Sequence, residues 1–197
     1  MAFRSFILAP PFTADRTYLH GADIFDGIVR HIGGAAADVR LTLTVASDCA
    51  IEVCEDEAEP RVPAERCGFL SYLDGGIRRQ LWLRQRNDLP IRERVLLEEA
   101  SLIEGAIFDG DRAAIPAGDA PFMRRVTAAS LHLLMTLSPG NYWSIAEIAC
   151  VRLPPCRSPA SVTLRRMLGG RCWKAIASAP DGTAGGTLLL ARGQPRR

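Results

Sequence analysis

Apolar residues recur every three or four positions in two stretches of the chain, and this spacing predicts two amphipathic helices. The first helix lies within residues 18–34 and the second covers residues 122–137. Five residues form each expected buried stripe: Ile24, Phe25, Ile28, Val29 and Ile32 in the first helix, and Phe122, Val126, Ala129, Leu133 and Leu137 in the second. Each stripe is broad enough to be buried against a sheet.

The signals at the ends of these helices place an aspartate at the start of each. Asp23 is the expected N-cap of the first helix, and Asp26 occupies the reciprocal capping position three residues later. Gly33-Gly34 supplies the left-handed stop. Asp119 is the expected cap of the second helix, because Pro121 follows in the first turn.

Alternating apolar and polar residues predict several strands. The alternation is strictest in residues 39–45, so one face of that strand should be buried and the other wet. Two pairs of runs are typical of antiparallel hairpins, because an Asp-Gly signal separates residues 67–73 from 77–85 and residues 173–178 from 187–192.

Other stretches are less regular. Further strands are expected at three places: residues 3–9, 50–54 and 142–153. Residues 158–168 fit a strand or a helix. Residues 95–115 fit a helical stripe nearly as well as a strand, and we predict a long strand with a bend near Gly105.

The two halves of the chain share one order of elements. Each has a strand, an Asp-capped helix, a strand after a glycine break, and a hairpin that turns on Asp-Gly. This order resembles the hot-dog fold, an α+β fold in which a curved antiparallel sheet wraps around a central helix. The resemblance implies two fused hot-dog-like halves, residues 1–95 and 96–197, packed as one globular unit. The competing architecture is one α+β domain in which a large antiparallel sheet packs against two helices.

Composition narrows the classes of function. The formal net charge is only +2 and no run of like charges occurs, so we expect no nucleic-acid partner. No stretch approaches the ~18–20 apolar residues of a membrane span, and the apolar run before Pro10-Pro11 is too short for a signal peptide. We therefore expect a cytoplasmic protein with no membrane partner.

The six cysteines contain no C-x-x-C pair, and the three histidines are not spaced to complete a zinc site. In a reducing compartment the cysteines should be thiols packed as small apolar side chains. We expect no metal and no cofactor.

The hot-dog resemblance implies chemistry on an acyl thioester, either hydrolysis or dehydration of a substrate carried by coenzyme A or an acyl carrier protein. Members of that superfamily place the thioester carbonyl near the N-terminal end of a central helix, where N–H groups and the helix dipole stabilise an oxyanion. The corresponding candidates here are His20 and Asp23 as catalytic groups and Asp26 as a substrate contact. Glu98 is a candidate general base on the following strand.

Other residues are candidates for holding the substrate. Arginines are concentrated between Arg78 and Arg94, and we single out Arg78 and Arg84 because guanidinium groups suit phosphate oxygens. The same arginines can instead form a solvated strand face. Tyr142 and Trp143 can line a pocket or simply pack.

Two functions follow from these residues. The first is an acyl-thioester enzyme, which can form a homo-oligomer. The alternative is a non-catalytic module that binds a small apolar ligand or another protein. In that module Asp23 and Asp26 only cap a helix.

Overall fold

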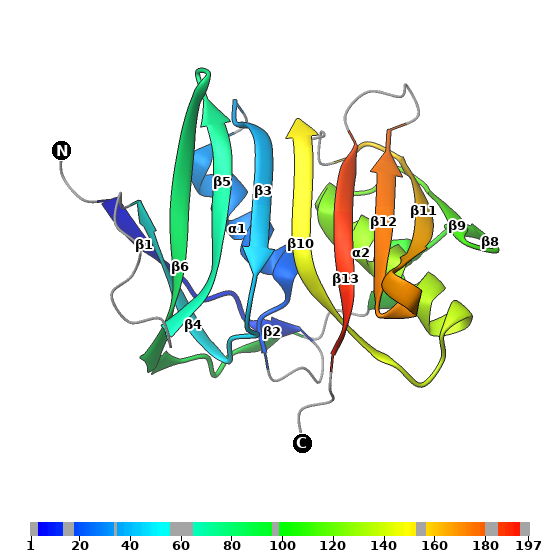
Figure 1. The fold of residues 1–197 in the computed structure, drawn as a ribbon, viewed down its shortest axis with the longest axis horizontal. Coiled ribbons are helices and arrows are strands. Elements are labelled where there is room, and N and C mark those ends of the chain that lie inside the picture. The colour runs from blue at the N-terminus through cyan, green and yellow to red at the C-terminus, as the bar shows by residue number, and fades with distance from the viewer. Residues whose placement is uncertain are drawn as a thin grey trace. The chain divides into compact units, whose positions relative to one another are not determined.

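The computed structural model describes seven stretches of the chain: residues 4–13, 18–33, 35–55, 65–95, 99–152, 157–179 and 185–193. The residues fall into two compact units, Met1–Leu97 and Glu98–Arg197. Each unit combines an antiparallel sheet with one long helix (Figure 1). The predicted α+β class is confirmed.

The first unit is built on a sheet with the strand order β1-β4-β6-β5-β3, in which all neighbours are antiparallel. Its strands are β1 (Arg4–Leu8), β3 (Ala37–Leu43), β4 (Cys49–Glu55), β5 (Arg66–Asp74) and β6 (Ile77–Pro90). A short strand β2 (Phe12–Thr13) pairs in parallel with β7 (Arg94–Val95). The strands predicted in residues 3–9, 39–45 and 50–54 and the first hairpin are confirmed.

The hairpin between β5 and β6 turns on two glycines. Asp74 and Ile77 form the last pair of the ladder, and Gly75 and Gly76 between them have φ angles of +55° and +86°. A two-residue turn with both central residues at positive φ matches the twist of the flanking strands. The Asp-Gly signal therefore marked the hairpin correctly, with Asp74 closing the ladder.

Helix α1 (Gly21–Ile32) packs against one face of this sheet (Figure 1). The ring of Phe6 in β1 stacks on His31 with 3.7 Å between ring centroids. A Cβ on Gly27 would lie 2.9 Å from Cδ2 of Leu8, so this glycine lets the helix approach β1 closely. Of the predicted stripe, Ile24, Phe25 and Ile28 are buried, and the stripe is narrower than predicted because two residues of its C-terminal part are only half-buried: Val29 and Ile32.

The second unit has a sheet with the strand order β10-β13-β12-β11-β9-β8. Its strands are β8 (Ile107–Asp109), β9 (Arg112–Ile115), β10 (Tyr142–Arg152), β11 (Ala160–Met167), β12 (Cys172–Ser178) and β13 (Gly186–Gly193). The strand in residues 142–153 and the β12–β13 hairpin are confirmed, and residues 158–168 contain a strand. The Asp181-Gly182 turn signal lies outside the described residues.

The long strand predicted over residues 95–115 is wrong. After β7 come a 3-10 helix, Glu99–Ile103, and then the hairpin of β8 and β9. Gly105 and Gly110 have φ angles of +72° and +56°, so the chain changes direction twice where one bend was expected. Each piece is too short to show a clear period in the sequence.

Helix α2 (Phe122–Leu137) is the second predicted helix, but its expected cap is wrong. Pro121 occupies the N-cap position, while Asp119 is exposed and pairs with Arg157 at 3.0 Å. The expected buried stripe holds through Leu133, whereas Leu137 at the C-terminal end is exposed.

None of the cysteines in the described residues forms a disulfide. Four are buried and one is half-buried: Cys49, Cys54, Cys67 and Cys150, and Cys172. Burial raises the pKa of the Cys67 thiol to about 12. Cys156 lies outside the described residues.

Candidate functional site

The N-terminal end of α1 is held in place by backbone hydrogen bonds. The N–H of Leu19 donates to the carbonyl of Ser47 at 2.7 Å, and Leu19 itself is buried. His20 follows with extended backbone at the N-cap position, and its carbonyl accepts the N–H groups of Asp23 and Ile24 at 3.0 and 3.1 Å. The imidazole of His20 is therefore attached to a fixed point at the start of the helix.

The first amides of α1 point out of the helix end. The N–H groups of Gly21 and Ala22 precede any intrahelical acceptor, as the first amides of every helix do. The side chain of the N-cap residue His20 makes no capping hydrogen bond. The end therefore combines the positive pole of the helix dipole with N–H groups that suit an oxyanion.

Two carboxylates are buried within the first two turns of α1. Asp23 is 6% exposed and Asp26 is 9% exposed. The predicted capping box is wrong, because the helix begins at Gly21, two residues before Asp23. The small residues Gly21 and Ala22 continue the helix toward His20, and this places Asp23 inside the first turn.

Three of the predicted site residues follow one another at the N-cap and along the first two turns of α1: His20, Asp23 and Asp26. An imidazole can give or take a proton near neutral pH, and a buried carboxylate beside it can act as a base or hold a charge. The adjacent N–H groups can polarise a carbonyl oxygen. Such an end of a helix can therefore support acid–base chemistry on a carbonyl compound.

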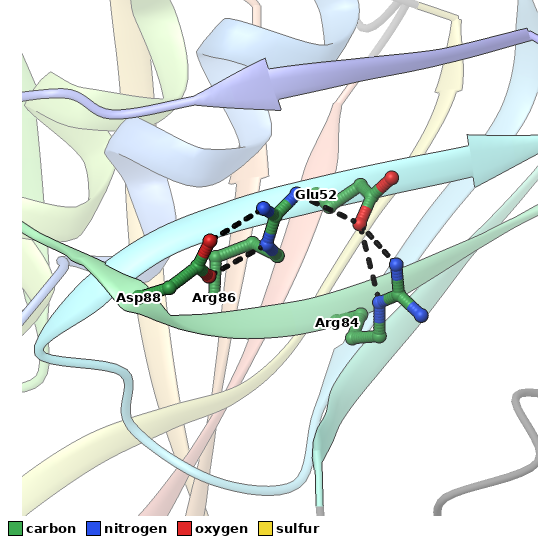
Figure 2. Close-up of polar contacts among 4 residues, drawn as sticks. All are labelled: Glu52, Arg84, Arg86 and Asp88. Atoms are coloured by element: carbon green, nitrogen blue, oxygen red, sulfur yellow. Dashed lines mark hydrogen bonds and ion pairs between the residues drawn. The ribbon is translucent and has the colours of Figure 1, made fainter.

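Arg78 and Arg84 both contact carboxylates of other strands of the sheet: Arg78 a carboxylate of β3, which lies beyond β5, and Arg84 one of the adjacent β4. Arg78 bonds to the carboxylate of Asp38 and, at 3.3 Å, to its carbonyl oxygen. Arg84 bonds to Glu52 of β4, as Figure 2 shows. Their proposed binding of phosphate stays a prediction.

Arg84 and α1 lie on opposite faces of the sheet of the first unit. Phe6 and Leu8 of β1 contact α1, and they pair with Val53 and Ile51 of β4, so these four residues share the helix-facing side. Side chains alternate along a strand, which turns Glu52 to the other face. Glu52 pairs in register with Arg84, so Arg84 lies on that face too.

The remaining predicted site residues lie elsewhere. Tyr142 and Trp143 begin β10 of the second unit, where Tyr142 pairs with Gly193 and Trp143 is buried. A Cβ on Gly193 would lie 2.8 Å from Cδ1 of Tyr142, so the tyrosine ring packs on the glycine backbone. A role in a pocket stays a prediction for both. Glu98 lies outside the described residues.

Sequence reasoning placed Arg86 in the arginine-rich stretch from Arg78 to Arg94, but it did not single out the two acids of this cluster, Glu52 and Asp88. The signal for Glu52 was an acid in the middle of an apolar strand, since such a residue needs a partner when it is buried. The signal for Arg86 and Asp88 was their spacing from Arg84, because residues two apart on a strand lie on the same face.

Two absences apply to the residues that the structure describes. No group of three or more His, Cys, Asp or Glu side chains in them is arranged to hold a metal ion. No helix among them is both long and apolar enough to cross a membrane.

No family model matches the sequence, and no curated protein matches it. Solved structures do resemble the fold. A protein assigned as a thioesterase II from Thermobifida fusca YX aligns with a TM-score of 0.53 and 8% identity, over 96% of this chain and 92% of that one. The dehydratase domain of RzxB from Pseudomonas fluorescens aligns with a TM-score of 0.49 and 10% identity, over 97% and 94% of the two chains.

An acyl-ACP thioesterase from Bacteroides thetaiotaomicron VPI-5482 aligns with a TM-score of 0.48 and 10% identity, over 95% and 97%. At these identities, the likeness concerns the fold. Together with the antiparallel sheet and the central helix, the first alignment shows that the chain has a hot-dog-like α+β fold.

Proposed function

We propose that this protein is an enzyme that acts on an acyl thioester, by hydrolysis or by dehydration, at the N-terminal end of α1. The observation that carries the proposal is the arrangement at that end: a histidine at the N-cap, amides with no intrahelical acceptor, and a buried aspartate in the first turn. The substrate would be carried by coenzyme A or by an acyl carrier protein.

The helix end supplies what a thioester carbonyl needs. Its oxygen would accept the N–H groups of Gly21 and Ala22, where the helix dipole favours negative charge. These donors are part of the backbone and are held by the anchor of Leu19 to Ser47. They need little reorganisation as the oxyanion forms.

His20 and Asp23 would move protons in either reaction. In hydrolysis, one of them takes a proton from water as the oxygen attacks the carbonyl carbon, and the thiol leaves when the C–S bond breaks. In dehydration, one takes the proton α to the carbonyl and the other protonates the departing β-hydroxyl. Asp26, one turn further along α1, is our candidate contact to the substrate.

Four further proposals concern the rest of the protein. We propose that residues 1–95 and 96–197 are two fused hot-dog-like halves. Arg78 and Arg84 are candidates for holding phosphates of the carrier, and Tyr142 and Trp143 are candidates for an apolar contact. The active protein can form a homo-oligomer.

The direct experiment is a screen of acyl-CoA and acyl-carrier substrates of several chain lengths, with 3-hydroxyacyl thioesters to detect dehydration. Asp23→Asn and His20→Gln should each lower kcat by about 10²-fold, since general acid–base groups contribute that much or more. His31→Gln is the matched control, because His31 lies in the last turn of the same helix.

The proposal fails if both site variants keep full activity toward a substrate that the wild-type protein turns over. It also fails if no substrate is turned over. If the protein turns over none of the screened substrates but still binds an acyl group, the non-catalytic module is favoured.

A further inference from the structure

Two arginines of β6 share one buried carboxylate on the sheet face that α1 does not cover. Nε of Arg84 lies 3.2 Å from Oε2 of Glu52, and Nη1 of Arg86 lies 3.4 Å from the same oxygen (Figure 2). The side chain of Glu52 is only 11% exposed. The hydrogen bond from Arg84 lowers the pKa of Glu52 below its usual value, so this carboxylate is charged at neutral pH.

A second carboxylate, that of Asp88, pairs with Arg86 from the solvent side. Nε and Nη2 of Arg86 donate to the two oxygens of Asp88 at 2.8 and 2.6 Å, which is a bidentate pair. Unlike Glu52, Asp88 is 61% exposed at its side chain. The cluster therefore has a buried carboxylate that positions both guanidinium groups and an exposed one that occupies the outer fork of Arg86.

A hollow of about 470 Å³ opens beside this cluster. Six polar residues line it: Glu65, Arg84, Gln85, Arg86, Asn87 and Asp88. Nη1 of Arg84 makes no hydrogen bond to any residue that the structure describes. The hollow therefore offers the N–H groups of Nη1 of Arg84. It also offers Nε and Nη2 of Arg86, which donate to the exposed Asp88.

We propose that this hollow binds an organic phosphate, a phosphate monoester on a molecule that also carries hydroxyl groups. The phosphate oxygens take the fork of Arg86 in place of Asp88 and accept from Nη1 of Arg84. Guanidinium forks match phosphate as they match carboxylate.

The other lining residues narrow the ligand class. The carboxylate of Glu65 adds a negative charge to the hollow, which opposes a bare phosphate ion. The same carboxylate accepts hydrogen bonds from hydroxyl groups, so a sugar phosphate or a nucleotide fits better than inorganic phosphate. Glu52 stays in place, because it is buried beneath both arginines.

This site is separate from the end of α1, since the two lie on opposite faces of one sheet. Arg84 is also our candidate for holding phosphates of the carrier, but this proposal concerns binding alone and is tested without thioester turnover. The phosphate could belong to coenzyme A or to a free phosphorylated metabolite, and the ligands of the experiment separate these sources.

The test is calorimetric titration of the full chain at constant ionic strength with inorganic phosphate, ribose 5-phosphate, AMP and coenzyme A. We expect ribose 5-phosphate or AMP to bind more tightly than inorganic phosphate. Binding of coenzyme A alone would identify the carrier as the source, provided that it depends on the same arginines.

Variants decide whether the hollow is the site. Arg84→Gln and Arg86→Gln should each weaken binding at least tenfold, whereas Arg79→Gln should change it less than twofold. Arg79 is the matched control, because it belongs to the same strand and pairs with Asp74 outside the hollow. Asp88→Asn should tighten binding several-fold, because it removes the carboxylate that competes for Arg86.

The proposal is overturned if none of the four ligands binds at millimolar concentration. It is also overturned if folded Arg84→Gln and Arg86→Gln bind as the wild type does, or if Asp88→Asn weakens binding. Circular dichroism and thermal melting of each variant show that the compared proteins are folded.

Discussion

The N-terminal ends of α1 and α2 have the same backbone hydrogen bonds and different side chains. In α1 the carbonyl of His20 accepts the N–H groups of Asp23 and Ile24. In α2 the carbonyl of Pro121 accepts those of Arg124 and Arg125, at 3.1 and 3.2 Å. Neither N-cap residue, His20 or Pro121, caps its helix with its own side chain. The backbone alone therefore does not distinguish the two ends.

The side chains give the α2 end a structural role. Arg125 is only 3% exposed, and its guanidinium donates to three carbonyl oxygens of the described residues: Pro116 at 2.6 Å, Ala120 at 3.1 Å and Ser158 at 2.6 Å. These bonds join the loop before α2 to the segment before β11. A buried cation saturated by carbonyl groups stabilises loops and is poorly suited to move protons.

The α1 end carries a histidine and two buried aspartates instead, and no basic side chain lies in its first turn. We infer from this difference that α2 repeats the backbone N–H donors of α1 but not the side chains that suit the α1 end to acid–base chemistry. Four measurements test the account of the two units, in order of expected effect.

Replacing Phe25 by alanine should give the largest loss of stability. Phe25 is fully buried in α1, and truncating a large core side chain costs ~3–5 kcal/mol. Urea denaturation measures the change in the free energy of unfolding. Met135→Ala, at an exposed position of α2, should cost much less. A loss below about 1 kcal/mol for Phe25→Ala would show that α1 is not a core helix.

Arg125→Met should lower the free energy of unfolding by about 3 kcal/mol, because hydrogen bonds from charged groups are strong and three carbonyls lose their donor. The activity per folded molecule should stay unchanged. Arg112→Met, at an exposed residue, serves as the control for loss of one positive charge. Loss of activity in folded Arg125→Met would mean that the α2 end takes part in the chemistry.

The stability supplied by Glu52 should depend on pH. Its folded-state pKa lies below the ordinary value of 4.5, because Arg84 donates to it. The contribution is therefore complete above the unfolded pKa and is lost as pH falls through the folded pKa. Denaturation between pH 7 and 3 should show the gap between wild type and Glu52→Gln narrowing with acid. A gap that is constant or widens would contradict the ion pair.

Thiol labelling should show the smallest effect. The pKa of about 12 leaves Cys67 almost entirely protonated at pH 8, while Cys172 of the other unit is only half-buried. Mass spectrometry of labelled peptides should therefore find Cys172 modified before Cys67. The reverse order would contradict the burial of Cys67.

Local patterns predicted most of the fold. Alternation located the strands around residues 39–45, and helical spacing located α1 and α2, because burial of one face leaves a period in the sequence. The caps failed at Asp23 and Asp119, because α1 begins earlier than predicted, with His20 as its N-cap, and α2 begins later, with Pro121 as its N-cap. The stretch 95–115 failed because its elements are too short for a period to appear.

The polar residues likewise divide into a group that the sequence predicted and a group that it did not. His20, Asp23 and Asp26 lie within one short segment, so sequence spacing was enough to group them. Glu52 and Arg84 are 32 residues apart and meet only through the register of β4 and β6. The sequence around either residue does not reveal how β4 and β6 pair, so the cluster in Figure 2 could be recognised only from the structure.

The most direct test of the α1 end is to record amide chemical shifts during titration with a non-hydrolysable ketone analogue of an acyl-CoA. Our account predicts the largest shifts at the N–H groups of Gly21 and Ala22, with little change at Met123 and Arg124 of α2. Asp23→Asn should retain the folded spectrum. Shifts at the α2 end that equal or exceed those at the α1 end would contradict the assignment of the site to α1.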